Sequence, residues 1–297
     1  MHSSLWHYLA NLQAPTILEV YQATKTCKGD VREDLKRDYV WLACSFFNMS
    51  QAQMLTGRPR PIEKLEFQKF LQVASRLIGG EPLALILGWQ EFLGRKFKVS
   101  QDVLIPRPET ETLVNTVQEA ISENPHWSAG LDIGTGSGCI AVSLALSSSQ
   151  IAWHAWDISD QALAIARENA GQLGARVSFD RQNILSGPIW LGPKLDVVVS
   201  NPPYIALEEK DDLSPSVVEF EPHIALFAPS EDPLRFYDKI GSWAYELLSV
   251  GGELFFETHY KFADDVAEKL SQLGYVKVRV RKDLFGNDRI VTATKNR

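Results

Sequence analysis

Apolar positions in the first 80 residues follow a helical period. In 31–42 they recur near i, i+4 and i+8, and 62–77 repeats the pattern with Gly79 and Gly80 directly after it. This spacing places apolar side chains on one face of a helix, and glycines commonly end one. Shorter helices are predicted over 4–12, 15–25 and 50–56. Residues 1–80 are therefore predicted to form a small helical domain, with substrate recruitment or scaffolding as its two candidate roles.

Residues 81–108 have the character of an extended connector. The segments 88–94 and 96–99 show the alternation and the glycines of a β-hairpin. After them, Arg107 lies in a proline-bracketed loop that leads into a helix ending near Ser122. A rigid loop with a cation, at the entrance to the domain that follows, is a candidate wall of the substrate site. Arg107 is therefore predicted to bind the substrate.

From Gly130 onward, strand-like runs alternate with helical segments. Strands are predicted over 131–133, 153–157, 176–180, 195–199 and 252–257, with helices over 139–146 and 234–248. Such alternation is typical of a doubly wound, mostly parallel sheet in an α/β fold. Two more strands, 274–280 and 289–294, are predicted to add an antiparallel edge at the C-terminus. Residues 109–297 are therefore predicted to be one α/β domain.

The polar, proline-punctuated segment 205–233 is predicted to be a long loop, of the kind that often covers an active site. Within it, His223 is the only histidine expected near the site. A lone histidine is more often structural than catalytic, so no general-base role is assigned to it.

Composition narrows the class of protein. The chain has 297 residues, of which 45% are hydrophobic, and a net charge of −7, with a pI of about 5.5. An acidic chain lacks the basic footprint of a general nucleic-acid-binding protein. Cys27, Cys44 and Cys139 have no metal-type spacing, and no apolar run reaches the roughly 18 residues of a membrane span. We expect a cytoplasmic monomer with no DNA, membrane or metal partner.

A glycine-rich turn follows the first strand of the α/β region. Asp132 and Ile133 lead into Gly134-Thr135-Gly136-Ser137-Gly138, and a helix begins at Cys139. Glycines let the backbone turn tightly and approach a ligand closely. No Lys-Ser or Lys-Thr pair follows, which excludes the Gly-x-x-x-x-Gly-Lys type of phosphate loop. Dehydrogenases and purely structural turns share such glycines, so this turn alone leaves the ligand open.

Two acids and a later loop favour an adenosyl cofactor. Asp157 closes the second strand, where an acid is placed to accept the two ribose hydroxyls of a nucleoside. Asp132 is predicted to face the cationic sulfonium and ammonium groups of the cofactor. After the third strand, Asn183 is predicted to accept a hydrogen bond from the adenine amino group, with Ile184 packing on the ring. Asp132 and Asp157, together with the glycines and the Asn-Pro-Pro-Tyr motif at 201–204, favour an adenosyl cofactor such as S-adenosylmethionine.

A buried-strand pattern ends in Ser-Asn-Pro-Pro-Tyr at residues 200–204. Two prolines stop the strand and stiffen a loop at the sheet edge where α/β proteins bind ligands. The Asn201 oxygen and the Pro202 carbonyl can accept the two hydrogens of a planar –NH2 group, while Pro203 and Tyr204 shape its slot. Asn201 and Pro202 are therefore the predicted catalytic residues, and Asn201 is also predicted to contact the cofactor. A proline-rich turn without chemistry is the plainer alternative.

Motifs spread across most of the chain carry a family resemblance. They are 80–84, Gly88 with Glu91 and Phe92, 104–111, 132–138, 201–205, Glu221 and Pro222 with Ala225 and Leu226, and Asp283 and Leu284 with Gly286 and Arg289. In these motifs the chain resembles the HemK-type protein-glutamine N5-methyltransferases, which modify class I peptide chain release factors. The resemblance implies a helical N-terminal domain joined by a hairpin to a Rossmann-like class I methyltransferase domain.

The resemblance also implies roles for individual residues. Residues 134–138, Asp157 and the loop 183–184 would hold S-adenosylmethionine, and Asn201 with Pro202 would hold the amide of the glutamine in a Gly-Gly-Gln motif. Two positions depart from the family pattern. Asn183 stands where many related enzymes have an acid, and Glu-Thr-His at 257–259 stands where Glu-Ile-Gly is common.

Three other functions stay open on sequence alone. A DNA or RNA adenine-N6 methyltransferase would use the same Asn-Pro-Pro-Tyr, but this chain has no obvious target-recognition domain. A glutamine methyltransferase for another protein would also fit. A non-catalytic cofactor-binding protein would be expected to lose the amide-holding residues, which are intact here.

Overall fold

The computed structural model describes residues 3–13, 15–27, 31–56, 60–187, 189–228, 232–283 and 285–296. The chain divides into two compact units: Met1–Gly88 with Pro215–Phe220, and Trp89–Ser214 with Glu221–Arg297. The predicted domain boundaries, 1–80, 81–108 and 109–297, stay a prediction, because compactness alone does not show which parts fold on their own.

The first unit is built from helices. They are α1 (Ser3–Ala10), α2 (Ile17–Tyr21), α3 (Ala23–Thr26), α4 (Glu33–Phe46), α5 (Gln51–Thr56), α6 (Lys64–Ile78), α7 (Leu83–Leu87) and α11 (Pro215–Phe220). Tyr39 and Phe70 lie fully buried in its core, with ring centroids 5.9 Å apart. The Tyr39 hydroxyl donates to the Val20 carbonyl at 2.8 Å, which satisfies the one polar atom of that ring.

The connector 81–108 is not extended throughout, so that prediction is wrong for α7. Its leucine, alanine and isoleucine residues favour a helical turn after Pro82, and Gly88 ends the turn with a φ of +76°. Beyond it, β1 (Trp89–Phe92) and β2 (Arg95–Lys98) pair antiparallel, which confirms the predicted hairpin. Leu93 and Gly94 both have positive φ, the geometry of a two-residue hairpin turn.

A seven-stranded sheet organises the second unit, in the order β5-β4-β3-β6-β7-β9-β8. Its strands are β3 (Ala129–Ile133), β4 (Ala152–Asp157), β5 (Val177–Arg181), β6 (Leu195–Ser200), β7 (Leu248–Glu257), β8 (Tyr275–Lys282) and β9 (Asp288–Lys295). The first five are parallel, and β9 runs antiparallel between β7 and β8. The predicted α/β fold class with an antiparallel C-terminal edge is confirmed.

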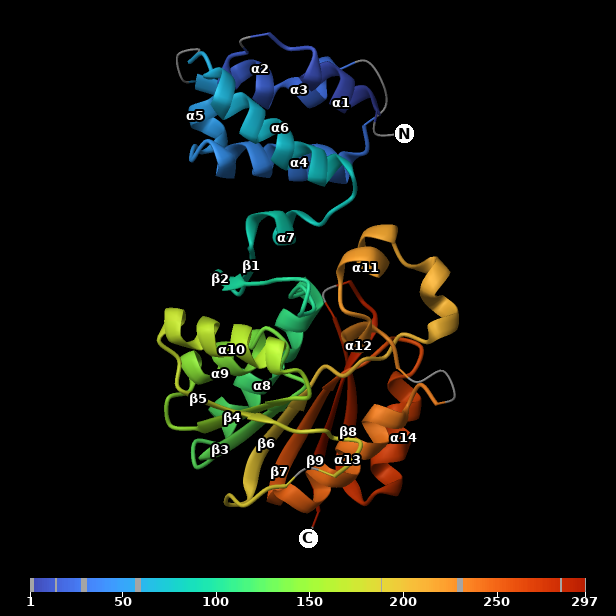
Figure 1. Cartoon of the computed structure of the whole chain (residues 1–297). Coiled ribbons are helices and arrows are strands. Elements are labelled where there is room, and N and C mark those ends of the chain that lie inside the picture. The colour runs from blue at the N-terminus through green and yellow to red at the C-terminus, as the bar shows by residue number, and fades with distance from the viewer. Residues whose placement is uncertain are drawn as a thin grey trace. The chain divides into compact units, whose positions relative to one another are not determined.

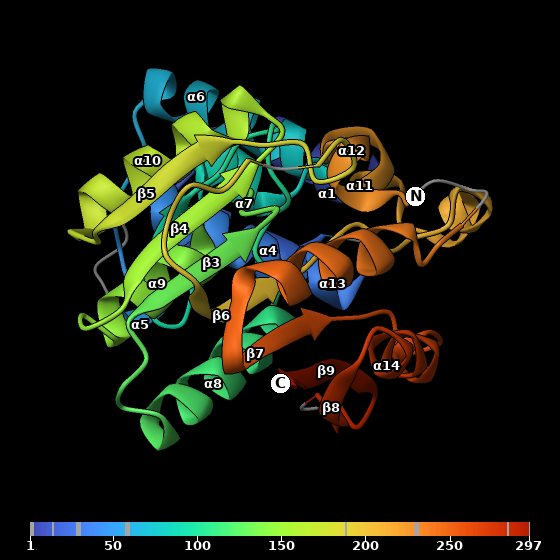
Figure 2. The same ribbon diagram turned by 90° about the horizontal axis from the view of Figure 1, so that it is seen from below.

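Helices cover both faces of this sheet (Figures 1 and 2). Those on one face are α8 (Pro108–Glu123), α9 (Cys139–Ser147) and α10 (Asp160–Leu173), and those on the other are α13 (Arg235–Leu247) and α14 (Ala263–Gln272). Successive side chains of β6 point to opposite faces of the sheet and join the core on each face in turn. Val197 and Val199 join the core under α8 and α9, whereas Val198 joins the core under α13 and α14.

The segment 205–233 is more structured than predicted. It contains η1 (Leu207–Asp212), α11 and α12 (His223–Leu226), and Leu226 is buried. Pro215 and Pro222 stand at the starts of two of these helices, where a missing N–H costs nothing. Residues 229–231 of this segment, and Leu284 of the predicted turn at 283–288, lie outside the described residues.

Across the described part of the chain, none of the helices combines the length and the apolar character that crossing a membrane requires.

Candidate active site

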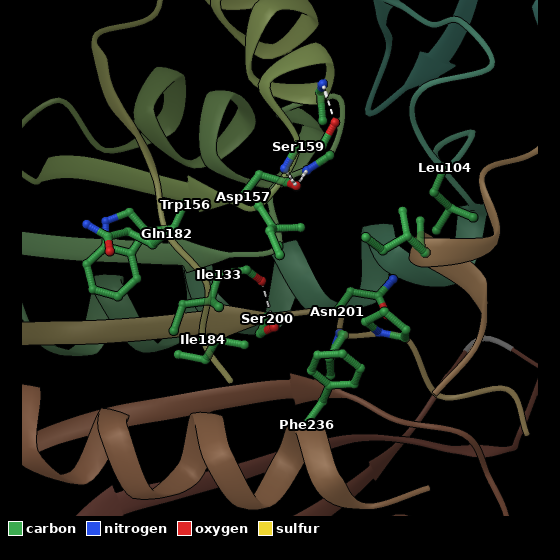
Figure 3. A pocket seen from close by; sticks show the side chains of 18 of the residues that line it. Leu104, Ile133, Trp156, Asp157, Ser159, Gln182, Ile184, Ser200, Asn201 and Phe236 are labelled. Carbon is green, nitrogen blue, oxygen red and sulfur yellow. Dashed lines mark hydrogen bonds between the residues drawn. The ribbon is translucent and has the colours of Figure 1, made fainter. Parts of the chain in front are cut away.

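A cavity of about 260 Å³ lies at the carboxyl ends of β3, β4, β5 and β6 (Figure 3). The chain runs outward from β3 to β5 and then returns to β6 on the other side of β3. This reversal makes the edge between β3 and β6 a switch point, the position where open α/β sheets bind ligands.

The predicted glycine loop forms one wall of the cavity. Gly134 and Gly136 line it, and their φ angles of +76° and +55° are ones that residues with a Cβ rarely adopt. A Cβ built on either glycine meets nothing within 4 Å, so the backbone there faces open space. The other loop members, Thr135, Ser137 and Gly138, are buried behind this surface and do not line the cavity.

Asp157 ends β4 beside the glycine loop and lines the cavity. Its Oδ2 accepts the Gly136 N–H and its Oδ1 accepts the Ser159 N–H, each at 2.9 Å. Burial raises the pKa of this carboxyl, and hydrogen bonds from the backbone N–H groups of Ser159, Gly136 and Ile158 oppose the rise. Each oxygen keeps a lone pair for a further donor. The contact of Asp157 with ribose hydroxyls stays a prediction.

Asn183 and Ile184 line the cavity in the loop after β5. Asn183 Oδ1 accepts the Leu185 N–H at 3.0 Å, so the amide is held within its own turn. Gln182 exchanges two hydrogen bonds with the Ile189 backbone, which closes the same loop. A contact with an adenine amino group would use the second lone pair of Asn183 Oδ1, and it stays a prediction.

Asp132 is fully buried behind the glycine loop and does not line the cavity. The Thr135 hydroxyl donates to its Oδ2 at 2.6 Å, whereas Oδ1 has no hydrogen-bond partner among the described residues. Burial outweighs this hydrogen bond and raises the pKa of Asp132 to about 7. The predicted contact with a cationic cofactor group therefore concerns a carboxyl one layer behind the cavity wall, and it stays a prediction.

The contribution of Asp132 to the free energy of unfolding is expected to fall as the pH rises from 3.8 to about 7. In this window folded Asp132 keeps a proton that the unfolded chain has lost, so its stabilisation is full below pH 3.8 and disappears through pH 7. One such group gives a slope of up to about 1.4 kcal/mol per pH unit. Urea unfolding at several pH values measures it, and Asp132→Asn is expected to show a shallower slope. The exposed Asp160→Asn serves as control, and equal slopes for Asp132→Asn and wild type would contradict the expectation.

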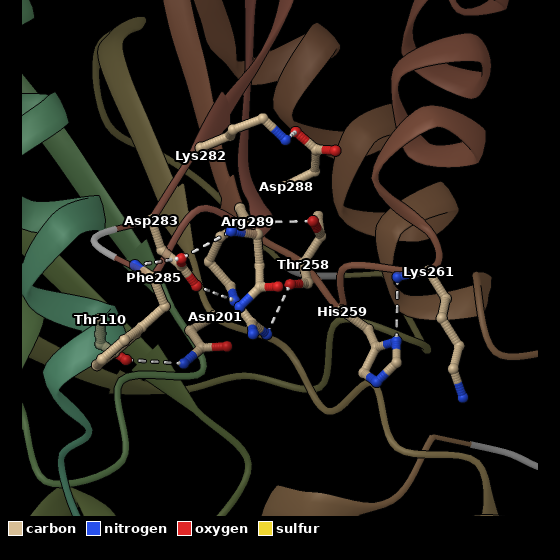
Figure 4. A network of polar contacts seen from close by, with 11 residues as sticks. Thr110, Asn201, Thr258, His259, Lys261, Lys282, Asp283, Phe285, Asp288 and Arg289 are labelled. Carbon is tan, nitrogen blue, oxygen red and sulfur yellow. Dashed lines mark hydrogen bonds and ion pairs between the residues drawn. The ribbon is translucent and has the colours of Figure 1, made fainter.

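The Asn-Pro-Pro segment lies where the sequence predicts it. β6 ends at Ser200, and Asn201, Pro202 and Pro203 line the cavity. Asn201 Nδ2 donates to the Thr110 hydroxyl oxygen at 3.3 Å, and the amide oxygen points away from Thr110 (Figure 4). The end of β6 thus presents an amide oxygen and a proline-stiffened backbone beside the cavity.

Tyr204 does not line the cavity, although the sequence predicts it as part of the substrate slot. Its ring packs against that of His259, with centroids 5.8 Å apart. Burial raises the pKa of Tyr204, so its hydroxyl stays neutral. The expectation that His223 is the only histidine near the site is wrong, because His259 is also there. His223 packs its own ring against Phe227, with centroids 5.3 Å apart.

Glu257, for which the sequence predicts no role, is buried beside Asn201. Strands β6 and β7 pair in parallel with Ser200 opposite Phe256, so the next residues along, Asn201 and Glu257, are neighbours. Burial raises the pKa of Glu257 to about 7, whereas a hydrogen bond with Thr110, the charge of Arg289 and a hydrogen bond with Asn201 lower it. Its Oε2 has no hydrogen-bond partner among the described residues.

The turn between β8 and β9 is tied to the end of β7 by Arg289 (Figure 4). Arg289 Nη1 donates to the Thr258 carbonyl at 3.2 Å, and Nε pairs with Asp283 Oδ2 at 3.3 Å. Asp283 Oδ1 also accepts the N–H groups of Phe285 and Asn287. The motif formed by Asp283 and Arg289 therefore has a structural role: it holds this turn beside the end of β7.

Arg107 does not line the cavity. It forms an ion pair with the buried carboxylate of Glu221, and the Ile105 N–H donates to Glu221 Oε2 at 3.0 Å. Leu104, in the same segment, does line the cavity. Arg107 thus joins the segment before α8 to the segment before α12, and its predicted contact with the substrate stays a prediction.

Several residues that line the cavity were not predicted. They are Asp102, Val103, Leu104, Ile133, Trp156, Ile158, Ser159, Ala162, Gln182, Leu185, Ser200, Ile224, Ala225, Phe236 and Ile240. Phe236 and Ile240 lie one turn apart on α13. Their spacing is that of any apolar helix face, so the sequence cannot separate a cavity wall from a core contact.

Comparisons with known proteins identify relatives of this chain. Residues 21–88 match the PrmC N-terminal domain, and residues 108–219 match the family described as the methyltransferase small domain. The chain is 41% identical over 263 residues to a release factor glutamine methyltransferase of Bacteroides thetaiotaomicron, covering 89% of this chain and 94% of that protein. The protein of that name from Bacillus cereus is 35% identical, with 93% and 99% covered.

Solved structures resemble the fold at lower identity. The catalytic domain of hMettl16, in complex with MAT2A 3'UTR hairpin 1, superposes with a TM-score of 0.56 at 22% identity, covering 87% of this chain and 91% of that one. A methyltransferase from Pyrococcus furiosus gives a TM-score of 0.50 at 18% identity, with 75% and 98% covered. Both support the fold alone.

Proposed function

The chain belongs to the release factor glutamine methyltransferase family, and on this premise we propose that it methylates the side-chain nitrogen N5 of a glutamine. The proposed substrate is the glutamine of the Gly-Gly-Gln motif in class I peptide chain release factors, and the proposed donor is S-adenosylmethionine. The observation that carries the proposal is Asn201, whose amide nitrogen donates to Thr110, in the lining of a cavity that the glycine loop and Asp157 also line. The family itself is that of a methyltransferase with an S-adenosylmethionine-type cofactor.

The residues around the cavity fit such a cofactor. A glycine wall without Cβ atoms lets a ligand approach the backbone at Gly134 and Gly136. The Asp157 oxygens can accept hydroxyl donors, and Ile184 offers an apolar surface for a ring. When bound, S-adenosylmethionine supplies a methyl group that its sulfonium makes electrophilic.

Residues of this chain can compensate for the low nucleophilicity of an amide nitrogen. An amide nitrogen is a poor nucleophile because its lone pair is delocalised into the carbonyl. We assign the Asn201 oxygen and the Pro202 carbonyl to accept the two N–H bonds of the substrate amide, which orients the nitrogen and favours the positive charge it gains. Pro203, which lines the cavity, is assigned to confine the amide plane, whereas Tyr204 packs against His259 and does not line the cavity. No strong base is required, because the methylated nitrogen becomes acidic and loses its proton to water afterwards.

The partner proposed for this chain comes from its relatives, which are named as release factor glutamine methyltransferases. We propose that the N-terminal helical region recruits the release factor and that the enzyme acts as a cytoplasmic monomer. The net charge of −7 disfavours general DNA binding.

The test is methyl transfer from labelled S-adenosylmethionine to an unmethylated class I release factor. A release factor with its Gly-Gly-Gln glutamine replaced by alanine, unmethylated DNA and unmethylated RNA run in parallel. Label on the intact release factor that disappears with the glutamine supports the proposal. Label on nucleic acid alone would move the enzyme to the adenine-N6 class, and label on neither would point to another protein substrate.

A further inference from the structure

We propose that Thr110 and Glu257 are positioning residues that decide which end of the Asn201 amide faces the cavity. The inference rests on the proposed function, in which the Asn201 oxygen accepts an N–H of the substrate. Neither residue lines the cavity, so they act through Asn201 and do not contact the substrate themselves.

An asparagine amide has a donor end and an acceptor end of nearly the same shape, so its partners decide its orientation. Thr110 is buried in the first turn of α8, and its hydroxyl oxygen accepts the Asn201 Nδ2 donor at 3.3 Å. Glu257 is buried at the end of β7, next to Asn201 in the strand register. Thr110 therefore faces the nitrogen end of the amide (Figure 4). Glu257 also forms a hydrogen bond with Asn201, and because a carboxylate can only accept, it faces the same end.

The available donors and acceptors determine the direction of the hydrogen bonds among Thr110, Glu257 and Asn201. An ionised carboxylate can only accept, whereas a hydroxyl has one hydrogen to give. Above its pKa of about 7, Glu257 is a carboxylate, so the hydrogen bond between Thr110 and Glu257 uses the Thr110 hydrogen. The lone pairs of the hydroxyl are left for Asn201 Nδ2. A reversed amide would bring its oxygen against the Glu257 carboxylate and lose the N–H contacts with both residues. The cluster thus holds the oxygen of Asn201 toward the cavity.

The orientation of the Asn201 amide matters because the –NH2 group of the substrate can only donate hydrogen bonds. The –NH2 of a glutamine side chain needs an acceptor, and a reversed Asn201 would present a second –NH2 to it. If the cluster is broken, both orientations become populated and only one of them binds the substrate amide. The apparent affinity for the substrate is then reduced in proportion to the fraction of molecules whose Asn201 oxygen faces the cavity. The turnover of bound substrate changes little.

The experiment compares four variants with wild type at pH 8, where Glu257 is ionised. Thr110→Val removes the hydroxyl at constant shape, Thr110→Ser restores it, and Glu257→Gln introduces a side chain that can donate as well as accept. Thr112→Val is the matched control, since Thr112 lies on the same helix and its buried hydroxyl has no hydrogen-bond partner among the described residues. For Thr110→Val and Glu257→Gln we expect KM for the release factor to rise about tenfold with kcat largely kept. Thr110→Ser and Thr112→Val should stay close to wild type.

A second readout needs neither substrate nor cofactor. The side-chain ¹⁵N–¹H signals of Asn201, assigned by their loss in Asn201→Asp, are expected to shift or double in Thr110→Val and to stay in place in Thr112→Val. Identical Asn201 signals in these two variants would overturn the inference, and so would equal rises in KM. A wild type that fails to methylate glutamine would refute the proposed function separately, and the spectra alone would then decide the orientation.

Discussion

Asn201→Ala is expected to lower kcat/KM for release factor methylation at least a hundredfold, which corresponds to about 3 kcal/mol of barrier. The substitution removes the oxygen that we assign to the substrate amide, so the nitrogen loses both its orientation and an acceptor for the charge it gains. The loss should appear mainly in kcat, because the acceptor matters most as the charge develops. Initial rates with labelled S-adenosylmethionine measure it.

Two controls separate this effect from damage to the fold. The cofactor Kd of Asn201→Ala should rise far less than kcat/KM falls, because the glycine loop and Asp157 are untouched and Asn201 is only one of the residues assigned to the cofactor. Its far-UV circular dichroism should match that of wild type. Asn124→Ala is the matched asparagine variant, since Asn124 caps the far end of α8 and does not line the cavity. A tenfold loss or less in Asn201→Ala would mean that another group holds the amide.

The sequence predicts the parts of this fold that depend on short-range signals. The β-branched run in β6, the glycines after β3 and the two prolines after Ser200 each determine local structure, and together they predict the edge of the sheet that carries the cavity. The helices within 205–233 are six, six and four residues long. Segments that short carry too little periodicity to be told from a loop.

The parts of the site that the sequence does not predict depend on contacts between distant residues. Ile105 and Glu221 are 116 residues apart, and Thr110 and Asn201 are 91 apart. Without the three-dimensional structure, Glu257 is one acid among many, and Arg107 looks like a free cation at a loop. Folding pairs Arg107 with Glu221 and buries Glu257 against Asn201. Sequence motifs therefore indicate which residues matter, whereas their partners become visible only in the structure.

Asp157→Ala is expected to weaken S-adenosylmethionine binding at least thirtyfold, or about 2 kcal/mol. The variant removes the acceptor assigned to the ribose hydroxyls, and it also leaves the Gly136 and Ser159 N–H groups without the carboxylate that orders the loop. Asp157→Asn should lose affinity as well, because an amide has one acceptor oxygen for two converging N–H donors. Titration calorimetry with the cofactor measures both.

The matched control is Asp160→Ala, three residues further along. Asp160 is exposed, pairs with Arg181 at 3.4 Å and does not line the cavity, so its removal changes charge by the same amount without touching the loop. If Asp160→Ala weakens binding as much as Asp157→Ala, the effect is general electrostatics. If only Asp157→Ala does, and Asn201→Ala keeps most of its cofactor affinity, the main contacts with the methyl donor lie at the β4 end of the cavity and the main contacts with the acceptor lie at the β6 end.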